Sequence, residues 1–513
     1  MSKGRIFKII RDNFAAIMLC IICAVLHFIY LDSAPAGWNV DEAGSAIDAW
    51  YIAHFGTDRY GYSYPVLFYN YGGGGQSALF TYMAAAIVKI FGFSLYTVRF
   101  TSAFMSLLPL ACGIVFLKML NVDKKYVNLF ALIYTAAPYF FMAGRFGLDC
   151  NLMLGTSSVF LICLAFAVKY DRKWLYFISG IAGGIVLYTY SLSYIVMIFF
   201  MLFFLIYLLY AKKLTVKKIL CICFPLGLMA SPLILEQLIN LLHHDTVKIW
   251  KFTFVNLGGY RIGELGASSL KNFGSLLKAT LFYDALPYNT NNRFLTLYWI
   301  SIPFFFIGFI SGCIDFVKAV RERSMNGGSI VMLWLISEII MVTMLRTDVN
   351  ANRINGIYLV VLLYVVYGIW NVAHRIKWEK AMLGIIAAGY IVMSVLFFTS
   401  YFKTEPKICR IYFGHTFENV IADIDSMEEL QGLRVCVGGY YDYYGISRLL
   451  LNDMLEAKAE IESGRFQHGL PENPEYSMCY IVMDSDWEYC QKLYGLGLKI
   501  KEYENGIKLF YPG

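Results

Sequence analysis

The chain has 513 residues, of which 58% are hydrophobic and 15% charged, and its mean hydropathy is +0.57. Soluble domains carry about 25% charged residues, so this composition excludes an ordinary soluble protein and indicates a surface that faces lipid. The formal net charge of +7 does not indicate nucleic acid as a partner, because Lys and Arg fall in short clusters between apolar runs, such as 124–125 and 212–213.

The apolar runs predict an all-α polytopic membrane protein with about eleven transmembrane helices. A spanning helix needs roughly 20 apolar residues, and the first candidate follows a basic N-terminus that carries Lys3, Arg5, Lys8 and Arg11. We interpret it as a retained signal anchor with a cytoplasmic N-terminus. The predicted spans are 14–31, 99–119, 126–144, 150–169, 174–192, 194–210, 219–240, 293–314, 329–346, 354–372 and 381–400.

One further apolar stretch, 76–92, is short, follows a run of four glycines and contains Lys89. If this stretch crossed the membrane, the basic clusters would fall outside, whereas loops rich in Lys and Arg stay in the cytoplasm. We therefore predict an interfacial helix at 76–92. The outward segments are then 32–98, 144–151, 241–292 and 347–353.

The chain divides into two predicted domains. Residues 1–400 form a transmembrane domain whose first outside loop is 32–98. Residues 401–513 have a soluble pattern and predict a small α/β domain outside the membrane, with strands at 433–438 and 480–483 and a helix at 447–457. The expected location is the cell membrane. Cysteines of this tail could pair in an oxidising space, but their spacing does not say how; they are Cys409, Cys436, Cys479 and Cys490.

The first outside loop contains the adjacent acids Asp41 and Glu42, preceded by Asn39. Two neighbouring carboxylates at a membrane surface repel each other and resist desolvation, an arrangement suited to a general base or a metal site. A structural interpretation is also open: Asn39 caps a helix and the acids face the positive end of its dipole.

Aromatic residues follow the acidic pair in the same loop, and Tyr62 and Tyr64 are two of them. Tyr190 lies at the outer end of a later span. Tyrosine collects at membrane interfaces, which is the default interpretation. It also packs well on sugar rings, so these three residues are candidates to line an acceptor cavity.

Three arginines lie at outer ends of spans, where positive charge is unusual: Arg99, Arg145 and Arg353. The planar guanidinium binds two phosphate oxygens at once, which makes them candidates for a donor phosphate. Salt bridges to nearby acids are the structural alternative. Asp149, four residues after Arg145, is either its partner or a second acid of an acceptor or metal site.

The order of these motifs resembles a family. The sequence Trp-Asn-Val-Asp-Glu at 38–42 after one span is similar to the first-loop acidic motif of GT-C-fold glycosyltransferases, in particular the group that includes protein O-mannosyltransferases, the aminoarabinose transferase and the RgtA/B/C/D-like enzymes. The helix at 76–92, Arg99-Phe-Thr-Ser-Ala and Arg145-Phe-Gly-Leu-Asp resemble motifs that follow in the same order, and so do 188–190 and Asn352-Arg353. The resemblance covers roughly residues 10–400. Four glycines replace the usual prolines before the surface helix.

The resemblance implies a transferase that inverts the sugar configuration at the outer face of the membrane. The donor would be a polyprenyl-phosphate-linked sugar, and the acceptor a lipid, glycan or protein. Asp41 would be the general base, Glu42 would assist it or help hold a metal, and the three arginines would stabilise the leaving phosphate. If a divalent metal ion takes part, Asp41 and Asp149 would be its ligands.

Two other classes of protein are compatible with the sequence. A transporter or flippase for lipid-linked glycans normally shows inverted repeats and polar residues in mid-span; no clear repeat is present, but Glu338 is a mid-span acid. A non-enzymatic assembly protein of the cell envelope is the other.

Overall fold

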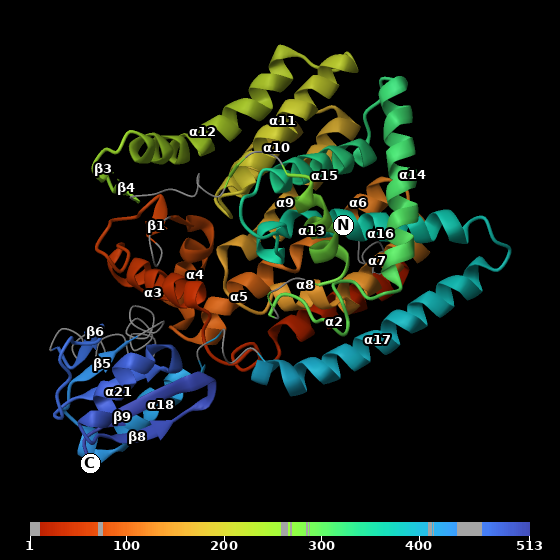
Figure 1. Ribbon diagram of the computed structural model, residues 1–513. Helices are drawn as coiled ribbons and strands as arrows, with labels where there is room; N and C mark the ends of the chain where they lie inside the picture. Colours follow the sequence, from red (N-terminus) through yellow and green to blue (C-terminus); the bar gives the residue numbers. More distant parts are fainter. Residues whose placement is uncertain are drawn as a thin grey trace.

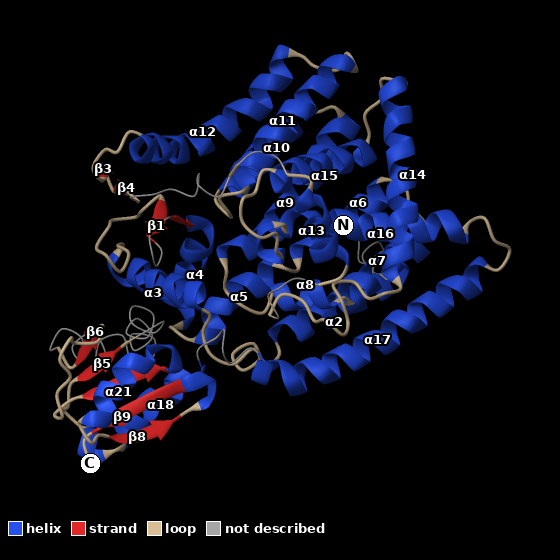
Figure 2. Ribbon diagram, viewed as in Figure 1, coloured by secondary structure: helices blue, strands red, loops and turns tan. Residues whose placement is uncertain are grey.

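The computed structural model describes residues 11–69, 75–257, 265–266, 269–283, 286, 288–408, 413, 415–438 and 464–513. It is mostly helical, with a small sheet domain at its C-terminal end (Figures 1 and 2). The predicted helix at 447–457, Cys409 and residues 72–74 of the glycine run lie outside the described residues.

Each predicted span contains at least one helix. Among the described residues, seven helical segments are long and apolar enough to cross a membrane, by length and composition. They are 95–119, 149–170, 193–210, 216–241, 301–321, 355–373 and 379–404. Other apolar helices are shorter, and they include Phe14–Phe28, Lys173–Leu187 and Gly327–Thr343.

The helical domain is an ordered series with two small hairpins. Its helices are α2 (Phe14–Phe28), α3 (Val40–Phe55), α4 (Ala78–Phe91), α5 (Leu95–Met105), α6 (Leu108–Met119), α7 (Lys124–Ala136), α8 (Pro138–Ala143), α9 (Leu152–Tyr170), α10 (Lys173–Leu187), α11 (Ser193–Tyr210), α12 (Val216–Leu241), α13 (Lys271–Leu281), α14 (Ser301–Arg321), α15 (Gly327–Thr343), α16 (Tyr358–Ala373) and α17 (Glu379–Ile408). Short 3-10 helices are η1 (Asp149–Asn151), η3 (Ala351–Arg353) and η4 (Asn355–Ile357). The hairpins pair β1 (Leu67–Tyr69) with β2 (Gly75–Ser77) and β3 (Val247–Ile249) with β4 (Phe252–Phe254).

The core of the helical domain lies around α9 and α16, whose side chains are mostly buried, whereas α12, α14 and α17 expose most of theirs. Apolar faces this large on an isolated chain indicate that lipid or another protein chain covers them. Outside the core, α3 and α4 pack on each other beside β1 (Figure 1). The predicted surface helix at 76–92 is α4, and it begins directly after β2.

The C-terminal domain has a five-stranded sheet in the order β6-β5-β7-β9-β8. The first three strands are parallel and the last two antiparallel, and both predicted strands, 433–438 and 480–483, are present as β5 and β7. The elements are α18 (His415–Ser426), η5 (Glu428–Leu430), β5 (Val435–Val437), β6 (Phe466–His468), β7 (Cys479–Met483), η6 (Asp484–Asp486), α21 (Trp487–Gly495), β8 (Lys499–Glu502), η7 (Glu504–Gly506) and β9 (Ile507–Tyr511). Cys436, Cys479 and Cys490 are buried as free thiols.

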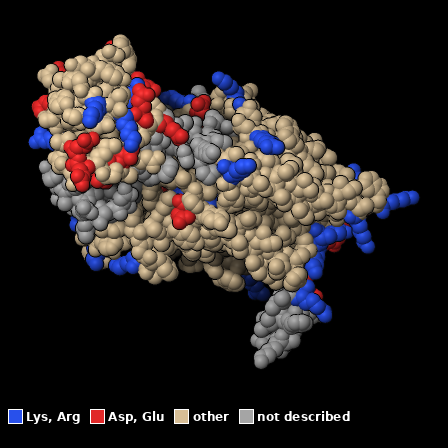
Figure 3. Space-filling model, turned by 90° about the horizontal axis from the view of Figure 1, so that it is seen from below, with Lys and Arg blue, Asp and Glu red and all other residues tan. Residues whose placement is uncertain are grey.

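Charge divides the surface into three zones. Side chains of both signs cover the C-terminal domain, basic side chains gather at the opposite end, and the surface between is mostly uncharged (Figure 3). A chain that crosses a membrane between its two ends has this distribution. The orientation, with the basic end in the cytoplasm, stays a prediction.

Candidate functional site

The acidic pair lies in the first turn of α3, and Asn39 caps that helix. The Asn39 side chain accepts the backbone N–H of Asp41 at 3.1 Å, and Glu42 accepts the backbone N–H of Asn39 at 3.2 Å. This reciprocal capping box satisfies two donors that the helix leaves free. The structural interpretation of the motif, a capped helix start, is therefore correct for Asn39 and Glu42, while the Asp41 side chain remains half-buried at the start of α3.

Glu42 is a fully buried anchor. Its carboxylate accepts Arg99 Nε at 2.8 Å and Arg99 Nη2 at 2.9 Å, and it also accepts the backbone N–H of Gly147 at 2.6 Å. Together with the bond from Asn39, these donors occupy both oxygens. These contacts leave no lone pair facing a substrate and favour a structural role for Glu42, while its assistance to catalysis stays a prediction.

Arg99 and Arg145 are held by contacts within the protein, and the structural alternative, a salt bridge to a nearby acid, is present for Arg99 with Glu42. Their role as phosphate ligands stays a prediction that these contacts do not favour. Besides Glu42, Arg99 donates to the backbone oxygens of Leu31, Pro35 and Gly37. A guanidinium has five N–H donors, and those of Arg99 all have acceptors within the protein.

Arg145 holds the end of α2 and the loop that follows. Its donors meet backbone oxygens at 2.6–3.2 Å. The acceptors belong to Leu26, His27, Ile29, Tyr30 and Ala34. A positive charge at the last carbonyls of a helix is favourable because it complements the helix dipole. The rings of Phe141 and Phe402 cover the guanidinium at 5.2 and 5.6 Å, so Arg145 has no free face for a donor.

β2 joins Asp41 to Asp149. Gln76 Nε2 donates to the backbone oxygen of Asp41 at 3.3 Å, and the next residue, Ser77, donates its backbone N–H to Asp149 Oδ2 at 2.9 Å. Asp149 is buried, and its other oxygen accepts the backbone N–H of Cys150 at 2.7 Å. Two consecutive residues of β2, Gln76 and Ser77, thus contact the two acids, one each.

Arg353 lies on η3, which packs against η1, the 3-10 helix that begins at Asp149. Asn355 connects the two segments, because its Nδ2 donates to the backbone oxygen of Cys150 at 3.1 Å and its Oδ1 accepts the hydroxyl of Tyr139. The Nε of Arg353 is buried and has no hydrogen-bond partner among the described residues. A buried donor of this kind points to a missing acceptor.

The structure separates the predicted tyrosines. Tyr62 and Tyr64 follow the C-terminal end of α3, and the 16 residues of that helix span about 24 Å. Beyond the helix the chain turns back along α3, since the backbone N–H of Arg59 donates to Asp48 Oδ1 at 3.1 Å. The role of Tyr62 and Tyr64 in an acceptor cavity stays a prediction. Tyr190 is buried next to the segment whose Tyr188 oxygen accepts the backbone N–H of Leu79 at 3.1 Å, so it lies near the junction of β2 and α4.

A second pair of buried acids, Asp48 and Asp58, shapes the turn after α3. Asp58 Oδ1 accepts the backbone N–H groups of Tyr60 and Tyr62 at 3.0 and 2.8 Å, and Arg59 lies 3.6 Å from Asp48 Oδ1. Burial, and then the neighbouring charge of Asp48, raises the pKa of Asp58 to about 6. Burial also raises the pKa of Asp48. The sequence motif did not single out these acids, because nothing in their spacing shows that both are buried.

A dedicated metal cage is not formed by the described residues, among which no group of three or more His, Cys, Asp or Glu could hold an ion. Asp41 and Asp149 alone would supply two carboxylates. Mg²⁺ is often held by one or two carboxylates when substrate phosphates and water complete its shell. The two residues fit that kind of site only.

Sequence reasoning missed Gln76, Gly147 and Asn355, although each connects two parts of the site. Gly147 carries a weak signal, since it lies between Arg145 and Asp149. A Cβ at this position would lie 2.6 Å from Phe80 Cζ and 3.2 Å from Glu42, so the close approach of the loop to Glu42 requires glycine. Asn355, two residues after Arg353, is a polar side chain at the start of an apolar span, which is a sign that could have been used.

Comparison with solved structures identifies the fold. The crystal structure of ArnT from Cupriavidus metallidurans bound to undecaprenyl phosphate aligns with a TM-score of 0.55 at 10% identity, covering 97% of this chain and 98% of that one. The apo state of ArnT gives a TM-score of 0.53 at 11% identity, over 96% and 97% of the two chains. No protein-family model and no curated protein matches the sequence. The chain is a membrane protein with the GT-C fold, as the resemblance predicts.

Proposed function

We propose that this protein transfers a sugar from a polyprenyl-phosphate donor to a hydroxyl-bearing lipid, glycan or protein at the outer face of the membrane. The observation that carries the proposal is that the segments bearing Asp41, Asp149 and Arg353 contact one another, since β2 bonds to both aspartates and η1 packs against η3. The shared fold supports the proposal, because ArnT binds undecaprenyl phosphate in one of the aligned structures.

Asp41 is the general base in this proposal. It takes the proton of the acceptor hydroxyl as the acceptor oxygen forms a bond to the anomeric carbon. The bond between that carbon and the donor phosphate oxygen breaks, and the phosphate leaves with the electron pair. Glu42 and Arg99 keep α3 in place, so that the half-buried Asp41 carboxylate is held at the rim.

Arg353 stabilises the leaving phosphate. The negative charge grows on the phosphate as the bond breaks, and a fixed positive group lowers the energy of that state. The Arg353 Nε, which lacks an acceptor among the described residues, is the donor available for this purpose. Asp149, which Ser77 and Cys150 hold in position, is proposed to contact the acceptor.

The test is transfer from a labelled polyprenyl-phosphate sugar, with membranes or proteoliposomes that contain the full chain. The Asp41→Asn variant keeps the backbone contacts of residue 41, so it should fold and insert but lose transfer at least a hundredfold. The control is Asp32→Asn, the same change at an exposed carboxylate of the same loop, which should keep transfer. Retained transfer by Asp41→Asn would overturn the base assignment.

A divalent ion between Asp41 and Asp149 stays a prediction. Washing with EDTA followed by addition of Mg²⁺ or Mn²⁺ tests it. Loss and recovery of transfer would show that a divalent ion is needed, as the proposed pair expects, and transfer that is unchanged after EDTA would remove the ion from the proposal.

A further inference from the structure

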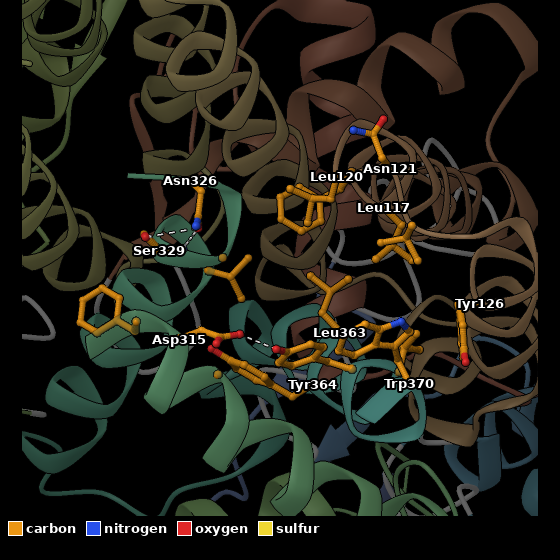
Figure 4. Close-up of a pocket in the computed structure, with 18 of the residues that line it drawn as sticks. Leu117, Leu120, Asn121, Tyr126, Asp315, Asn326, Ser329, Leu363, Tyr364 and Trp370 are labelled. Carbon is orange, nitrogen blue, oxygen red and sulfur yellow. Dashed lines mark hydrogen bonds between the residues drawn. The ribbon is translucent and has the colours of Figure 1, made fainter. Parts of the chain in front are cut away.

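A cavity of about 590 Å³ lies at the other end of the helical domain, far from α3 and β1. We name it the inner cavity. Its walls come from α6, α14, α15 and α16 and from the loop between α6 and α7 (Figure 4). These are the helix ends that the basic clusters adjoin, on the predicted cytoplasmic side. The inner cavity therefore does not belong to the candidate transfer site.

The inner cavity is apolar inside and polar at its mouth. Buried side chains such as Phe116, Leu117 and Val366 line the interior, whereas Asn121 and Asn326 are exposed at the entrance. A volume of this size is typical of sites for small molecules. The gradient from apolar to polar fits a lipid chain that enters from the membrane and leaves its headgroup at the mouth.

Charge at the mouth identifies the headgroup. The charged residues that line the inner cavity, in the part of the chain described, are the carboxylates Asp123 and Asp315. The Tyr367 hydroxyl donates to Asp315, and Lys125 Nζ lies 3.5 Å from Asp123. An anionic headgroup inside this rim would meet two negative charges, but an ammonium group would meet two acceptors.

Basic side chains lie just outside the mouth. Lys125 is partly exposed and paired with Glu379 at 2.7 Å. Lys318 follows Asp315 by one helical turn on α14 and is exposed, and its pair with Glu322, at 4.0 Å, is loose, so Lys318 is the more available of the two. A headgroup with its ammonium toward the aspartates can therefore place its phosphate toward these lysines. A headgroup that fits this mouth carries both a positive amine and a negative phosphate, as an aminophospholipid does.

We propose that the inner cavity binds a membrane phospholipid with a primary-amine headgroup, of the phosphatidylethanolamine class. One acyl chain fills the apolar interior, the ammonium donates to Asp315 and Asp123, and the phosphate faces the basic side chains. This proposal does not depend on the transfer reaction, because it concerns the opposite end of the molecule.

The test uses the purified full chain, freed of lipid in detergent and then given equal amounts of phosphatidylethanolamine, phosphatidylglycerol and phosphatidylcholine with the same acyl chains. Native mass spectrometry counts the lipids retained at rising collision energy. We expect phosphatidylethanolamine to be retained at least tenfold over the other two. Phosphatidylcholine is the sharper comparison, since its quaternary ammonium has no N–H to donate.

Gly328→Trp is the variant that fills the inner cavity. Gly328 lines it, and a Cβ there would meet only Asn326 Oδ1, at 3.3 Å. We expect retention to be lost in this variant. The matched control is Gly384→Trp on α17, where a Cβ would meet nothing within 4 Å, and which should retain the lipid.

Asp315→Asn tests the headgroup assignment without changing the size of the side chain. We expect the preference for phosphatidylethanolamine to fall below threefold. Equal retention of the three lipids by the unchanged protein would overturn the headgroup assignment, and so would an unchanged preference in Asp315→Asn. A folded Gly328→Trp variant that still retains the lipid would overturn the inner cavity as its site.

Discussion

The ion pair with Glu42 indicates that Arg99 stabilises the fold, whereas Arg353 is proposed to bind the donor. Arg99→Leu tests this assignment. The substitution leaves a fully buried carboxylate with two backbone donors, from Asn39 and Gly147. Removal of one partner of a buried ion pair costs about 3–5 kcal/mol. The carbonyls of Leu31, Pro35 and Gly37 also lose their donor.

The assay compares the thermal unfolding of detergent-solubilised Arg99→Leu and Arg353→Leu, followed by intrinsic fluorescence. A change of 1 kcal/mol shifts Tm by about 2 °C or less in a chain of this size, so Arg99→Leu should lower Tm by several degrees. Arg353→Leu is the matched change at an arginine whose Nε has no partner among the described residues. It should leave Tm nearly unchanged and raise the donor KM or lower kcat.

A double variant refines the magnitude. Glu42→Leu combined with Arg99→Leu removes the uncompensated charge, so its loss of stability should be smaller than the sum of the single losses. An unchanged Tm in Arg99→Leu together with weaker donor binding would refute the structural assignment. It would restore Arg99 as a phosphate ligand.

Three further predictions concern the surroundings of the site. Burial raises the pKa of Asp58 to about 6, so protonated Asp58 stabilises the fold fully below about pH 4. This contribution, at most roughly 3 kcal/mol, is lost as the pH rises through 6. In a series of Tm values measured against pH, Asp58→Asn should flatten that decline. Gly147→Ala should lower Tm by the equivalent of about 1–3 kcal/mol and slow transfer. The control Gly384→Ala adds a Cβ in open space and should change neither Tm nor transfer. Equal Tm values for the two variants would contradict the close contact of residue 147 with Glu42. Asn355→Ala loses bonds to Tyr139 and Cys150, so the donor KM should rise as η3 shifts; an unchanged KM would disconnect Arg353 from the donor.

The arrangement of apolar helices could be predicted from the sequence because lipid requires long apolar runs, and each run has a helix. The helix in the short stretch at 76–92 was also predicted and is present as α4, while its interfacial position, inferred from the basic clusters, stays a prediction. The strands at 433–438 and 480–483 were predicted from their short apolar runs. Each of these elements is determined by contacts between residues close in the sequence, or by whether its side chains face lipid or water.

The salt bridge of Arg99 to a nearby acid was among the alternatives that the sequence offered, but the backbone partners of the arginines could not be predicted, for a physical reason. Arg99 and Arg145 bind backbone oxygens of residues 26–37, and any residue type offers such an oxygen. A pattern of side chains therefore carries no record of these bonds. The place of Tyr62 and Tyr64 could not be predicted either, because it depends on the turn after α3, where Arg59 returns to Asp48.

The adjacency of Asp41 and Glu42 is itself the reason that they do different work. Consecutive residues on an α-helix point about 100° apart, so a helix that packs one of them into the core must turn the other toward the rim. Glu42 takes the inward position and is occupied by Arg99, Gly147 and Asn39, and Asp41 stays half-buried at the edge. Glu42→Gln should therefore lower Tm in the same assay that leaves Asp41→Asn unchanged, while Asp41→Asn abolishes transfer. If Glu42→Gln instead lost transfer with an unchanged Tm, the two carboxylates would share one catalytic role and the division inferred from the helix geometry would be wrong.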